Sequence, residues 1–245
     1  MSDTYRIAVI EKAGYGLSGS MTTKRTVGNL VAESREALKL SGINPPYILA
    51  PHSYSGFEAI WWANNYPEEV KAVLGIDMGF PNMALAQAKE ISEDQKKKMV
   101  QQQRKLLSVI AKQGFISKLV RNKTINVSGL MTSNELTDDE KKLYQELFYK
   151  NLLNEEIAEE ALLMTENAVK ADKSGILRCP GCFYISSMKS PVKSITWQDA
   201  GIAYVKECGG ELHLSKEGHF LYACIPDEMA ATFKSFIERT LRGNS

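Results

Sequence analysis

The 245-residue sequence lacks features that mark several classes of protein. It has only four cysteines (Cys179, Cys182, Cys208 and Cys224), too few for the disulfide framework of a small secreted domain. No apolar run approaches the roughly 20 residues of a membrane helix, and the first residues lack the charged-then-apolar layout of a signal peptide. We therefore expect a soluble, cytoplasmic chain with no membrane segment.

An excess of charge of one sign is also missing. The 30 Lys and Arg residues nearly balance the 29 Asp and Glu residues, and the formal net charge is +1. A basic face or tail that would attract a phosphate backbone is not indicated by this balance. Nucleic acid is therefore not an expected partner.

The cysteines do not indicate a metal or redox site. Cys179 and Cys182 have the C-x-x-C spacing of redox motifs, which place the first cysteine at a helix N-terminus. Here the motif runs into the strand-like segment 183–186. A second C-x-x-C, which would complete a zinc site, is missing from the sequence. We expect structural cysteines, no metal and no cofactor.

What the sequence does contain is a strand, a tight turn and a helix around Ser53. An apolar run from Tyr47 to Ala50 precedes the turn, and helical apolar spacing follows it. A serine at such an apex exposes its hydroxyl, and N–H groups of the next helical turn face the same space. The usual G-x-S-x-G motif is incomplete, because Pro51 and Ser55 replace its glycines, although Gly56 follows. The turn alone fits a nucleophile or a plain connection equally well.

Strand-like and helix-like segments alternate in the first third of the chain. We expect strands over 5–10, 47–50 and 71–77, and a helix over 26–41 that ends at Ser41-Gly42. Such alternation predicts an α/β fold with a parallel sheet, whose ligands gather at the carboxyl ends of its strands. Ser53 and Asp77 both lie at such ends.

Residues 82 to about 173 contain no strand-like run. Their helical patterns break at Gly114, over 122–126, at Gly129 and near Asn154. An all-helical insertion between strands fits a cap over an active site, or a helical layer packed on the sheet. We predict a core over 1–81, a helical cap over 82–175 and the rest of the core over 176–245. That last part should contain strands 182–187 and 211–215 and helices 196–208 and 227–241.

Three histidines are candidates for the base that a nucleophilic serine needs. His219 follows the last expected strand, in a loop before the terminal helix. His52 is next to Ser53 and is expected to point elsewhere, and His213 lies inside a strand. With Ser53 at another strand end, His219 favours a nucleophile and base pair.

The segment Gly14-Tyr-Gly16-Leu-Ser-Gly19 matches the dinucleotide fingerprint G-x-G-x-x-G after a strand. In that motif the helix begins at the third glycine, but here it is expected only near Thr26. The next strand ends at Pro51-His52, without the acidic residue that would hold a ribose. A dinucleotide-dependent oxidoreductase is therefore the weakest interpretation.

The segments, in this order, resemble the α/β-hydrolase superfamily across nearly the whole chain. The segment 11–18, Glu-Lys-Ala-Gly-Tyr-Gly-Leu-Ser, resembles its acidic-x-x-G-x-G-x-S loop. Residues 51–56 resemble its nucleophile elbow, and Glu217-Gly-His219-Phe resembles its histidine loop. The resemblance implies a mostly parallel sheet with a helical cap, and a serine hydrolase acting on a small-molecule ester or amide-like bond through an acyl-enzyme.

The resemblance also implies residue roles. Ser53 would be the nucleophile, His219 the general base and then acid, and the N–H of Tyr54 one oxyanion donor. In most members the acid follows the penultimate strand, where this sequence has no carboxylate until Asp199. A minority take it from the strand after the elbow, which ends at Asp77. We choose Asp77, with Asp199 as the alternative.

The sequence departs from the family at its start. Members usually have about three strands before segment 5–10 and a glycine-rich loop with the second oxyanion donor, whose loss costs about 100- to 1,000-fold in turnover. The chain therefore looks shortened at its N-terminus, and an unpaired sheet face would favour association into oligomers. The alternative function is a catalytically silent binding protein of the same fold, or an inactive truncated form.

Overall fold

The computed structural model describes residues 1–112, 130–132, 136–151 and 154–242. The helix breaks predicted at Gly114, over 122–126 and at Gly129 lie outside these residues. Two compact units are present. The first comprises Met1–Ile10, Thr26–Glu90 and Met164–Ser245, and the second comprises Glu11–Arg25 and Ile91–Leu163. The predicted cap limits, 82 and 175, stay a prediction.

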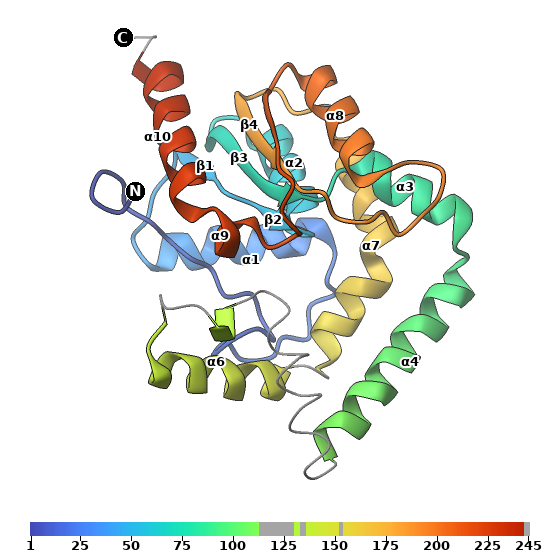
Figure 1. Ribbon diagram of the computed structural model, residues 1–245. Coiled ribbons are helices and arrows are strands. Elements are labelled where there is room, and N and C mark those ends of the chain that lie inside the picture. Colours follow the sequence, from blue (N-terminus) through green and yellow to red (C-terminus); the bar gives the residue numbers. More distant parts are fainter. Residues whose placement is uncertain (113–129, 133–135, 152–153, 243–245) are drawn as a thin grey trace. The chain divides into compact units, whose positions relative to one another are not determined.

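The first unit contains the strands and the helices that cover them (Figure 1). Its strands are β1 (Tyr47–Leu49), β2 (His52–Ser53), β3 (Val70–Met78), β4 (Gly181–Ile185) and β5 (Glu211–Leu214). Its helices are α1 (Val27–Leu40), α2 (Ser55–Asn65), α3 (Pro81–Glu90), α8 (Trp197–Cys208), α9 (Leu221–Cys224), α10 (Pro226–Arg242) and the second half of α7 (Glu155–Lys173).

The five strands form one parallel sheet in the order β1-β3-β4-β5, and β2 pairs with β3 beyond the end of β1. Ile76 of β3 pairs with Tyr184 of β4, and Tyr184 pairs with His213 of β5. All pairings are parallel, so the carboxyl ends of the strands lie at one edge of the sheet. The predicted parallel sheet is confirmed.

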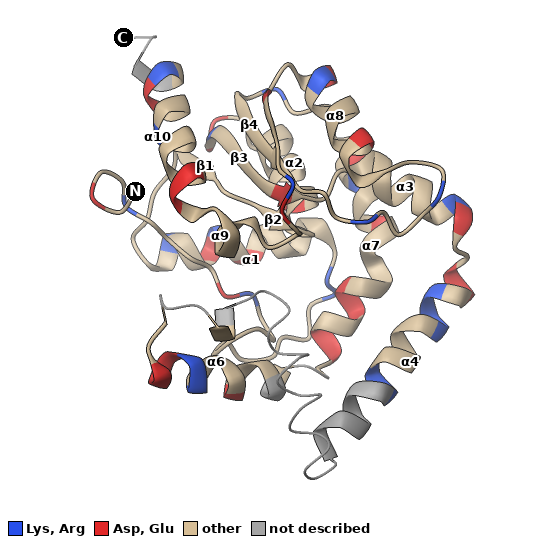
Figure 2. Ribbon diagram, in the orientation of Figure 1, with Lys and Arg blue, Asp and Glu red and all other residues tan. Residues whose placement is uncertain are grey.

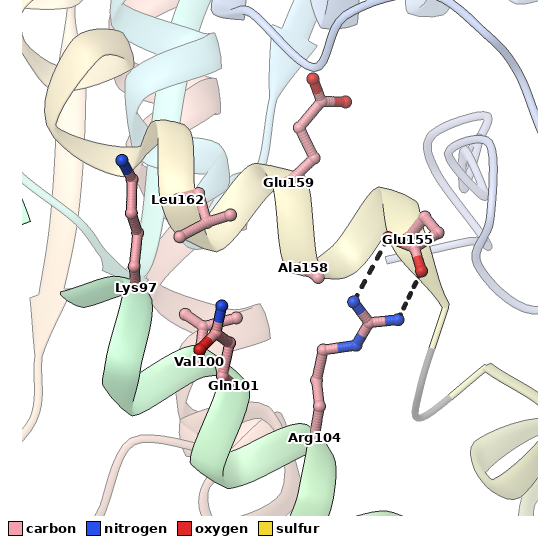
Figure 3. Close-up of a pocket in the computed structure, with 8 residues that line it drawn as sticks. All are labelled: Lys97, Val100, Gln101, Arg104, Glu155, Ala158, Glu159 and Leu162. Carbon is pink, nitrogen blue, oxygen red and sulfur yellow. Dashed lines mark hydrogen bonds and ion pairs between the residues drawn. The ribbon is translucent and has the colours of Figure 1, made fainter. Parts of the chain in front are cut away.

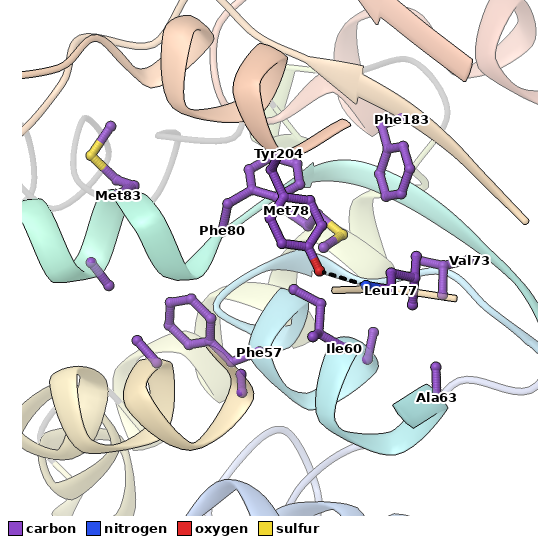
Figure 4. Close-up of a cluster of buried hydrophobic side chains, with 14 of the residues drawn as sticks. Phe57, Ile60, Ala63, Val73, Met78, Phe80, Met83, Leu177, Phe183 and Tyr204 are labelled. Carbon is purple, nitrogen blue, oxygen red and sulfur yellow. Dashed lines mark hydrogen bonds between the residues drawn. The ribbon is translucent and has the colours of Figure 1, made fainter. Parts of the chain in front are cut away.

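Alternate residues of the central strands pack in two separate apolar clusters, one on each face of the sheet. Val73 and Phe183 belong to a cluster with α1, α2, α8 and the end of α7, part of which Figure 4 shows. The hydroxyl of Tyr204 lies inside it and accepts the N–H of Leu177 at 3.3 Å. Leu74 and Tyr184 face the opposite cluster, with α9 and α10. Because both faces are covered, β3 and β4 are apolar over residues 72–76 and 182–185, as the middle of a parallel sheet requires.

Side-chain caps begin two of the helices. The Thr26 hydroxyl accepts the N–H of Asn29 at the start of α1, and the Thr196 hydroxyl accepts the N–H of Asp199 at the start of α8. Each cap satisfies one of the N–H groups that a helix leaves without an internal partner. The predicted helices 26–41 and 196–208 therefore begin and end within one residue of the expected positions.

The strand predicted over residues 5–10 is wrong. No strand is assigned there, and the side chains of residues 6–10 are exposed, with Val9 87% and Ile7 56% accessible. An isolated strand has no partner for its N–H and C=O groups, and β1 is the outermost strand of the described sheet on its side. The apolar sequence of this segment is therefore not sufficient to make it a strand.

The second unit combines the loop Glu11–Arg25 with helices. It contains α4 (Glu93–Lys112), η2 (Leu130–Thr132), α6 (Asp138–Asn151) and the first half of α7. The predicted break near Asn154 is found between α6 and α7. Figure 2 shows that charges of both signs occur along α4.

A buried ionic cluster ties the loop Glu11–Arg25 to α7 within this unit. The Glu160 carboxylate accepts hydrogen bonds from Lys12 Nζ at 2.8 Å and from Arg25 Nη2 at 3.1 Å. The Arg25 side chain is fully buried and that of Glu160 is 4% exposed. A buried charge is costly unless it is paired, so this loop depends on the cluster for its position.

Candidate active site

Ser53 lies at a sharp turn between β2 and α2. Its φ of 53° is left-handed, a conformation that costs a residue with a side chain roughly 1–2 kcal/mol. Such strained residues cluster at functional sites. Pro51 lies at an interruption of the strand, between β1 and β2, where a sheet tolerates proline. The carbonyl of Pro51 still accepts the N–H of Ile76 at 2.9 Å, so the interruption preserves the contact with β3.

The turn requires a glycine at position 56, because two backbone segments approach closely there. A Cβ atom on Gly56 would lie 2.2 Å from the carbonyl oxygen of Gly79. The N–H of Gly79 donates to the carbonyl of Ser53 at 2.6 Å, which ties the turn to the end of β3. The small residue that the elbow needs on its helical side is therefore Gly56, and Ser55 begins α2.

Three of the residues singled out in the sequence are joined by hydrogen bonds. The Ser53 Oγ lies 2.8 Å from Nε2 of His219, and Nδ1 of His219 lies 2.5 Å from Oδ2 of Asp77. A carboxylate only accepts, so Nδ1 carries the ring proton. In the neutral imidazole Nε2 is then an acceptor, and it faces the hydroxyl of Ser53. The serine is therefore hydrogen-bonded to a base that is itself held by a carboxylate.

Asp77 is fully buried at the end of β3, and its φ of 47° is also left-handed. Its Oδ1 accepts the N–H of Ser186 at 2.7 Å and the indole N–H of Trp197 at 2.8 Å. Its Oδ2 accepts the hydroxyl of Ser186 at 2.6 Å in addition to His219. These donors compensate the burial of a charge, which would otherwise be expensive.

Ser186 and Trp197 were missed in the sequence as parts of this site. A signal for Ser186 exists, because it follows the buried strand next to β3. The pairing of Ile76 with Tyr184 brings the ends of β3 and β4 to the same edge. The sequence has no comparable signal for Trp197, because its indole N–H reaches Asp77 only after α8 packs on the sheet.

Asp199, the alternative acid, has a different partner. Its Oδ2 accepts the hydroxyl of Thr196 at 2.6 Å, and its N–H donates to the same hydroxyl oxygen. Its exposed side chain thus belongs to the cap of α8. Of the two candidates, Asp77 is the one that contacts His219.

His52 does not point away from the site, as the sequence suggested. Its Nε2 lies 3.0 Å from the backbone carbonyl of His219, and the two rings are 4.5 Å apart between centroids. Burial of the ring lowers the pKa of His52 below the ordinary histidine value, so the ring is neutral near pH 7. Because a carbonyl can only accept, the ring proton is on Nε2. The turn geometry alone did not reveal this contact.

Tyr54, the expected oxyanion donor, is the residue directly before α2. Its hydroxyl is held by Asn167, whose amide Nδ2 donates to it. The Oδ1 of Asn167 accepts the N–H of Val27 at 2.7 Å, so this fully buried side chain links the start of α1 to Tyr54. The role of the Tyr54 N–H as an oxyanion donor stays a prediction.

One group of side chains in the described residues has the composition of a metal site. Ligand atoms of Cys182, Glu211 and His213 lie within 4.8 Å of one another. Other interactions account for them, since the Glu211 carboxylate pairs with Arg239 at 2.7 Å and with His213 at 2.8 Å. Burial raises the pKa of Cys182 to about 12, so its thiol is protonated. We assign no metal to this group.

The C-x-x-C motif shows no redox geometry either. All four cysteines are free thiols, and burial raises the pKa of Cys179 to about 11. A reactive cysteine needs the opposite shift of its pKa. These two cysteines therefore fit the structural role that the sequence indicated.

The glycine loop does not open into a helix. The N–H of Gly14 donates to the carbonyl of Gly19 at 2.9 Å, which closes a compact turn. The next helix, α1, begins only at Val27. A pyrophosphate site needs the helix N-terminus directly after the glycines, so the dinucleotide interpretation fails.

A cavity of about 430 Å³ lies in the second unit, between α4 and α7 (Figure 3). Val100, Ala158 and Leu162 are its apolar lining, and the ion pair of Arg104 with Glu155 spans one end. The cavity contains none of the residues that the sequence indicated for catalysis.

Comparisons with known proteins give relatives in sequence and in fold. No protein-family model matches the sequence. The chain is 34% identical over 166 residues to YbdG, an uncharacterized protein of Bacillus subtilis (strain 168), and the match covers 68% of this chain and 48% of YbdG. The chain is also 30% identical over 77 residues to YqjL, an uncharacterized protein of the same organism, and this match covers 31% of the chain and 30% of YqjL. The chain therefore spans about half the length of YbdG.

Solved structures of hydrolases resemble nearly the whole chain. A mutant epoxide hydrolase from Bacillus megaterium matches with a TM-score of 0.66 at 15% identity, over 91% of this chain and 81% of its own. An esterase from Thermogutta terrifontis matches with 0.61 at 13% identity, over 94% and 78%. An enol-lactonase from Burkholderia xenovorans LB400 matches with 0.58 at 10% identity, over 92% and 78%. The chain has the α/β-hydrolase fold, with a parallel sheet and a helical insertion.

Within the described parts of the chain, none of the helices is both long enough and apolar enough to cross a membrane.

Proposed function

We propose that this chain is a serine hydrolase that cleaves an ester or amide-like bond through an acyl-enzyme. One observation carries the proposal: Ser53 Oγ is 2.8 Å from His219 Nε2, and His219 Nδ1 is 2.5 Å from the buried Asp77. A nucleophile, a base and an acid that orients the base are the parts that acyl transfer needs. The likeness of the fold to an esterase supports the same reaction class.

In the first half of the proposed reaction, Ser53 Oγ attacks the carbonyl carbon of the substrate while its proton passes to Nε2 of His219. Asp77 stabilises the imidazolium that forms, through its bond to Nδ1–H. The N–H of Tyr54 donates to the oxyanion of the tetrahedral intermediate. The intermediate then releases an alcohol or amine, which takes the proton from Nε2, and an acyl ester on Ser53 remains.

In the second half, water replaces the leaving group. His219 Nε2 accepts a proton from the water as its oxygen attacks the acyl carbon. When the second tetrahedral intermediate collapses, the carboxylic acid leaves and the proton returns to Ser53 Oγ. The left-handed backbone of Ser53 presents the hydroxyl outward at the turn, where a substrate carbonyl can approach it.

A fluorophosphonate probe tests this proposal, because it labels only serines that a nearby base activates. We expect one equivalent of label on the peptide that carries Ser53, found by mass spectrometry of the digested protein. Ser53→Ala should abolish the label. Ser41→Ala, which changes an exposed serine at the end of α1, is the matched control and should label like the natural chain.

Turnover of short p-nitrophenyl esters extends the test to the complete cycle. We expect Ser53→Ala and His219→Ala each to lower kcat by on the order of 10⁶-fold. A folded chain that neither labels nor turns over these esters, but gains thermal stability with acyl ligands, would instead support the catalytically silent binding protein.

A further inference from the structure

The backbone carbonyl of His219 is a second point at which the catalytic histidine is held. Asp77 fixes its ring through Nδ1, and His52 contacts its main chain, with Nε2 3.0 Å from the carbonyl oxygen. The ring of His52 also lies against that of His219, with centroids 4.5 Å apart and planes tilted by 37°. The histidine is thus held both at its ring and at its backbone.

Aromatic neighbours hold the ring of His52 in this orientation. Phe220 lies 5.7 Å from it between centroids, and Tyr222 meets it edge-on at 5.1 Å. Both neighbours belong to the segment that follows His219. A ring packed among such neighbours loses little further freedom when it donates to the carbonyl, so the hydrogen bond is preorganised.

The position of His52 in the sequence gives this contact a consequence for the serine. His52 precedes Ser53 directly, and both residues form β2. His52 therefore connects the two catalytic residues: its peptide bond joins it to Ser53, and its ring bonds the backbone carbonyl of His219. The rest of the histidine loop is exposed over residues 216–218. Ser187 bonds the carbonyls of Lys216 and Glu217, whereas His52 bonds the carbonyl of His219 itself.

We propose that His52 is a positioning residue that keeps His219 within proton-transfer distance of Ser53, through its hydrogen bond to the backbone carbonyl of His219. The inference rests on the proposed hydrolase function. His52 does not touch the reacting atoms, and no proton of the reaction passes through it. Its contribution is geometric, because a displacement of about 1 Å between nucleophile and base can cost on the order of 100-fold in rate.

The experiment compares His52→Phe, His52→Gln and His52→Asn in the full chain. Phenylalanine keeps an aromatic ring beside His219 but removes the donor. Glutamine has an amide N–H that reaches about as far as Nε2, whereas the asparagine amide reaches only about as far as Nδ1. His213→Phe is the matched control, because it makes the same change at a histidine of β5 whose ring bonds Glu211 and which is no part of the Ser53–His219–Asp77 chain of hydrogen bonds.

We expect His52→Phe to lower kcat for p-nitrophenyl acetate by about 10- to 100-fold, with KM changed less than about twofold, because substrate contacts are unaffected. The rate of fluorophosphonate labelling should fall in parallel. His52→Gln should recover most of the lost activity and His52→Asn much less. His213→Phe should retain the natural kcat.

Two results would overturn the inference while the proposed function stands. In the first, the natural chain is active and the His52→Phe variant keeps its kcat within twofold. In the second, the His52→Gln and His52→Asn variants have equal kcat. The comparison of Gln with Asn remains decisive if the phenylalanine variant fails to fold. If the natural chain neither reacts with the fluorophosphonate nor hydrolyses esters, the proposed function itself is wrong. Failure of the proposed function is therefore distinguished from failure of the His52 inference.

Discussion

Replacing Asp77 with asparagine turns one carboxylate oxygen into an amide NH₂ that can only donate. All groups that face Asp77 donate to it: the N–H of Ser186 and the indole of Trp197 at Oδ1, the hydroxyl of Ser186 and Nδ1 of His219 at Oδ2. An NH₂ at the Oδ1 position would face two N–H groups that cannot accept, at about 1–3 kcal/mol for each buried donor left unpaired. At the Oδ2 position it faces a hydroxyl that can rotate and an imidazole that can change tautomer. The NH₂ group of the asparagine therefore takes the Oδ2 position, and its oxygen takes the Oδ1 position.

In that orientation His219 can pair with the amide only by accepting at Nδ1, so the ring proton moves to Nε2. The nitrogen that faces Ser53 is then protonated and cannot accept the hydroxyl proton. We expect kcat to fall about 10⁴-fold, which corresponds to about 5.4 kcal/mol of transition-state stabilisation. Initial rates with p-nitrophenyl acetate measure the loss, and a thermal unfolding curve checks that the variant is folded.

Asp199→Asn is the matched control, since it makes the same change at an acid that bonds the Thr196 cap of α8. We expect its kcat to stay within about twofold of the natural chain, with a stability loss of about 1 kcal/mol from the weaker cap. A folded Asp77→Asn variant that keeps more than a tenth of the natural kcat would refute this reasoning. A large loss in Asp199→Asn alone would move the role of the acid to Asp199.

Three further experiments test the packing around the site and within the second unit. Gly56→Ala should lower the free energy of unfolding in urea by about 1–3 kcal/mol, because its Cβ would lie 2.2 Å from a backbone oxygen; an unchanged value would contradict the close approach. Ser53→Gly should be more stable than Ser53→Ala by about 1 kcal/mol, since φ is 53°, and the reverse order would argue against a left-handed serine. Glu160→Gln should lower the free energy of unfolding in urea by about 3–5 kcal/mol, because it weakens the pairing of the buried Arg25. Glu155→Gln, at an exposed side chain, is the control and should lower it by less than about 1 kcal/mol; equal losses in the two variants would contradict the reasoning.

The parallel sheet and the location of the candidate site follow from local sequence patterns. Short apolar runs typical of strands alternate with segments whose apolar residues have helical spacing, and turn residues separate the two. Parallel strands place their carboxyl ends at one edge, so residues that follow different strands meet there whatever their separation in sequence. Ser53, Asp77 and His219 could therefore be placed at one edge of the sheet before their distances were known.

Some features depended on partners that the local sequence does not specify. Segment 5–10 has the composition of a buried strand, yet no described strand pairs with it, and the side chains of residues 6–10 are exposed. A strand is stable only when its backbone groups have partners and its apolar side chains are covered. Composition indicates that a segment can be a strand, and the neighbouring strands determine whether it becomes one.

The acid and the side chains that support it were also decided by tertiary structure. The resemblance favoured Asp77 and kept Asp199 as the alternative; the register between β3 and β4 and the packing of α8 bring Ser186 and Trp197 to Asp77. The contact of His52 with the carbonyl of His219 depends on how a distant loop folds back over β2. The sequence alone thus determined which residue types lie at the ends of the strands, through short-range periodicity. Which of them touch was determined by sheet register and helix packing, because these bring together groups more than 100 residues apart.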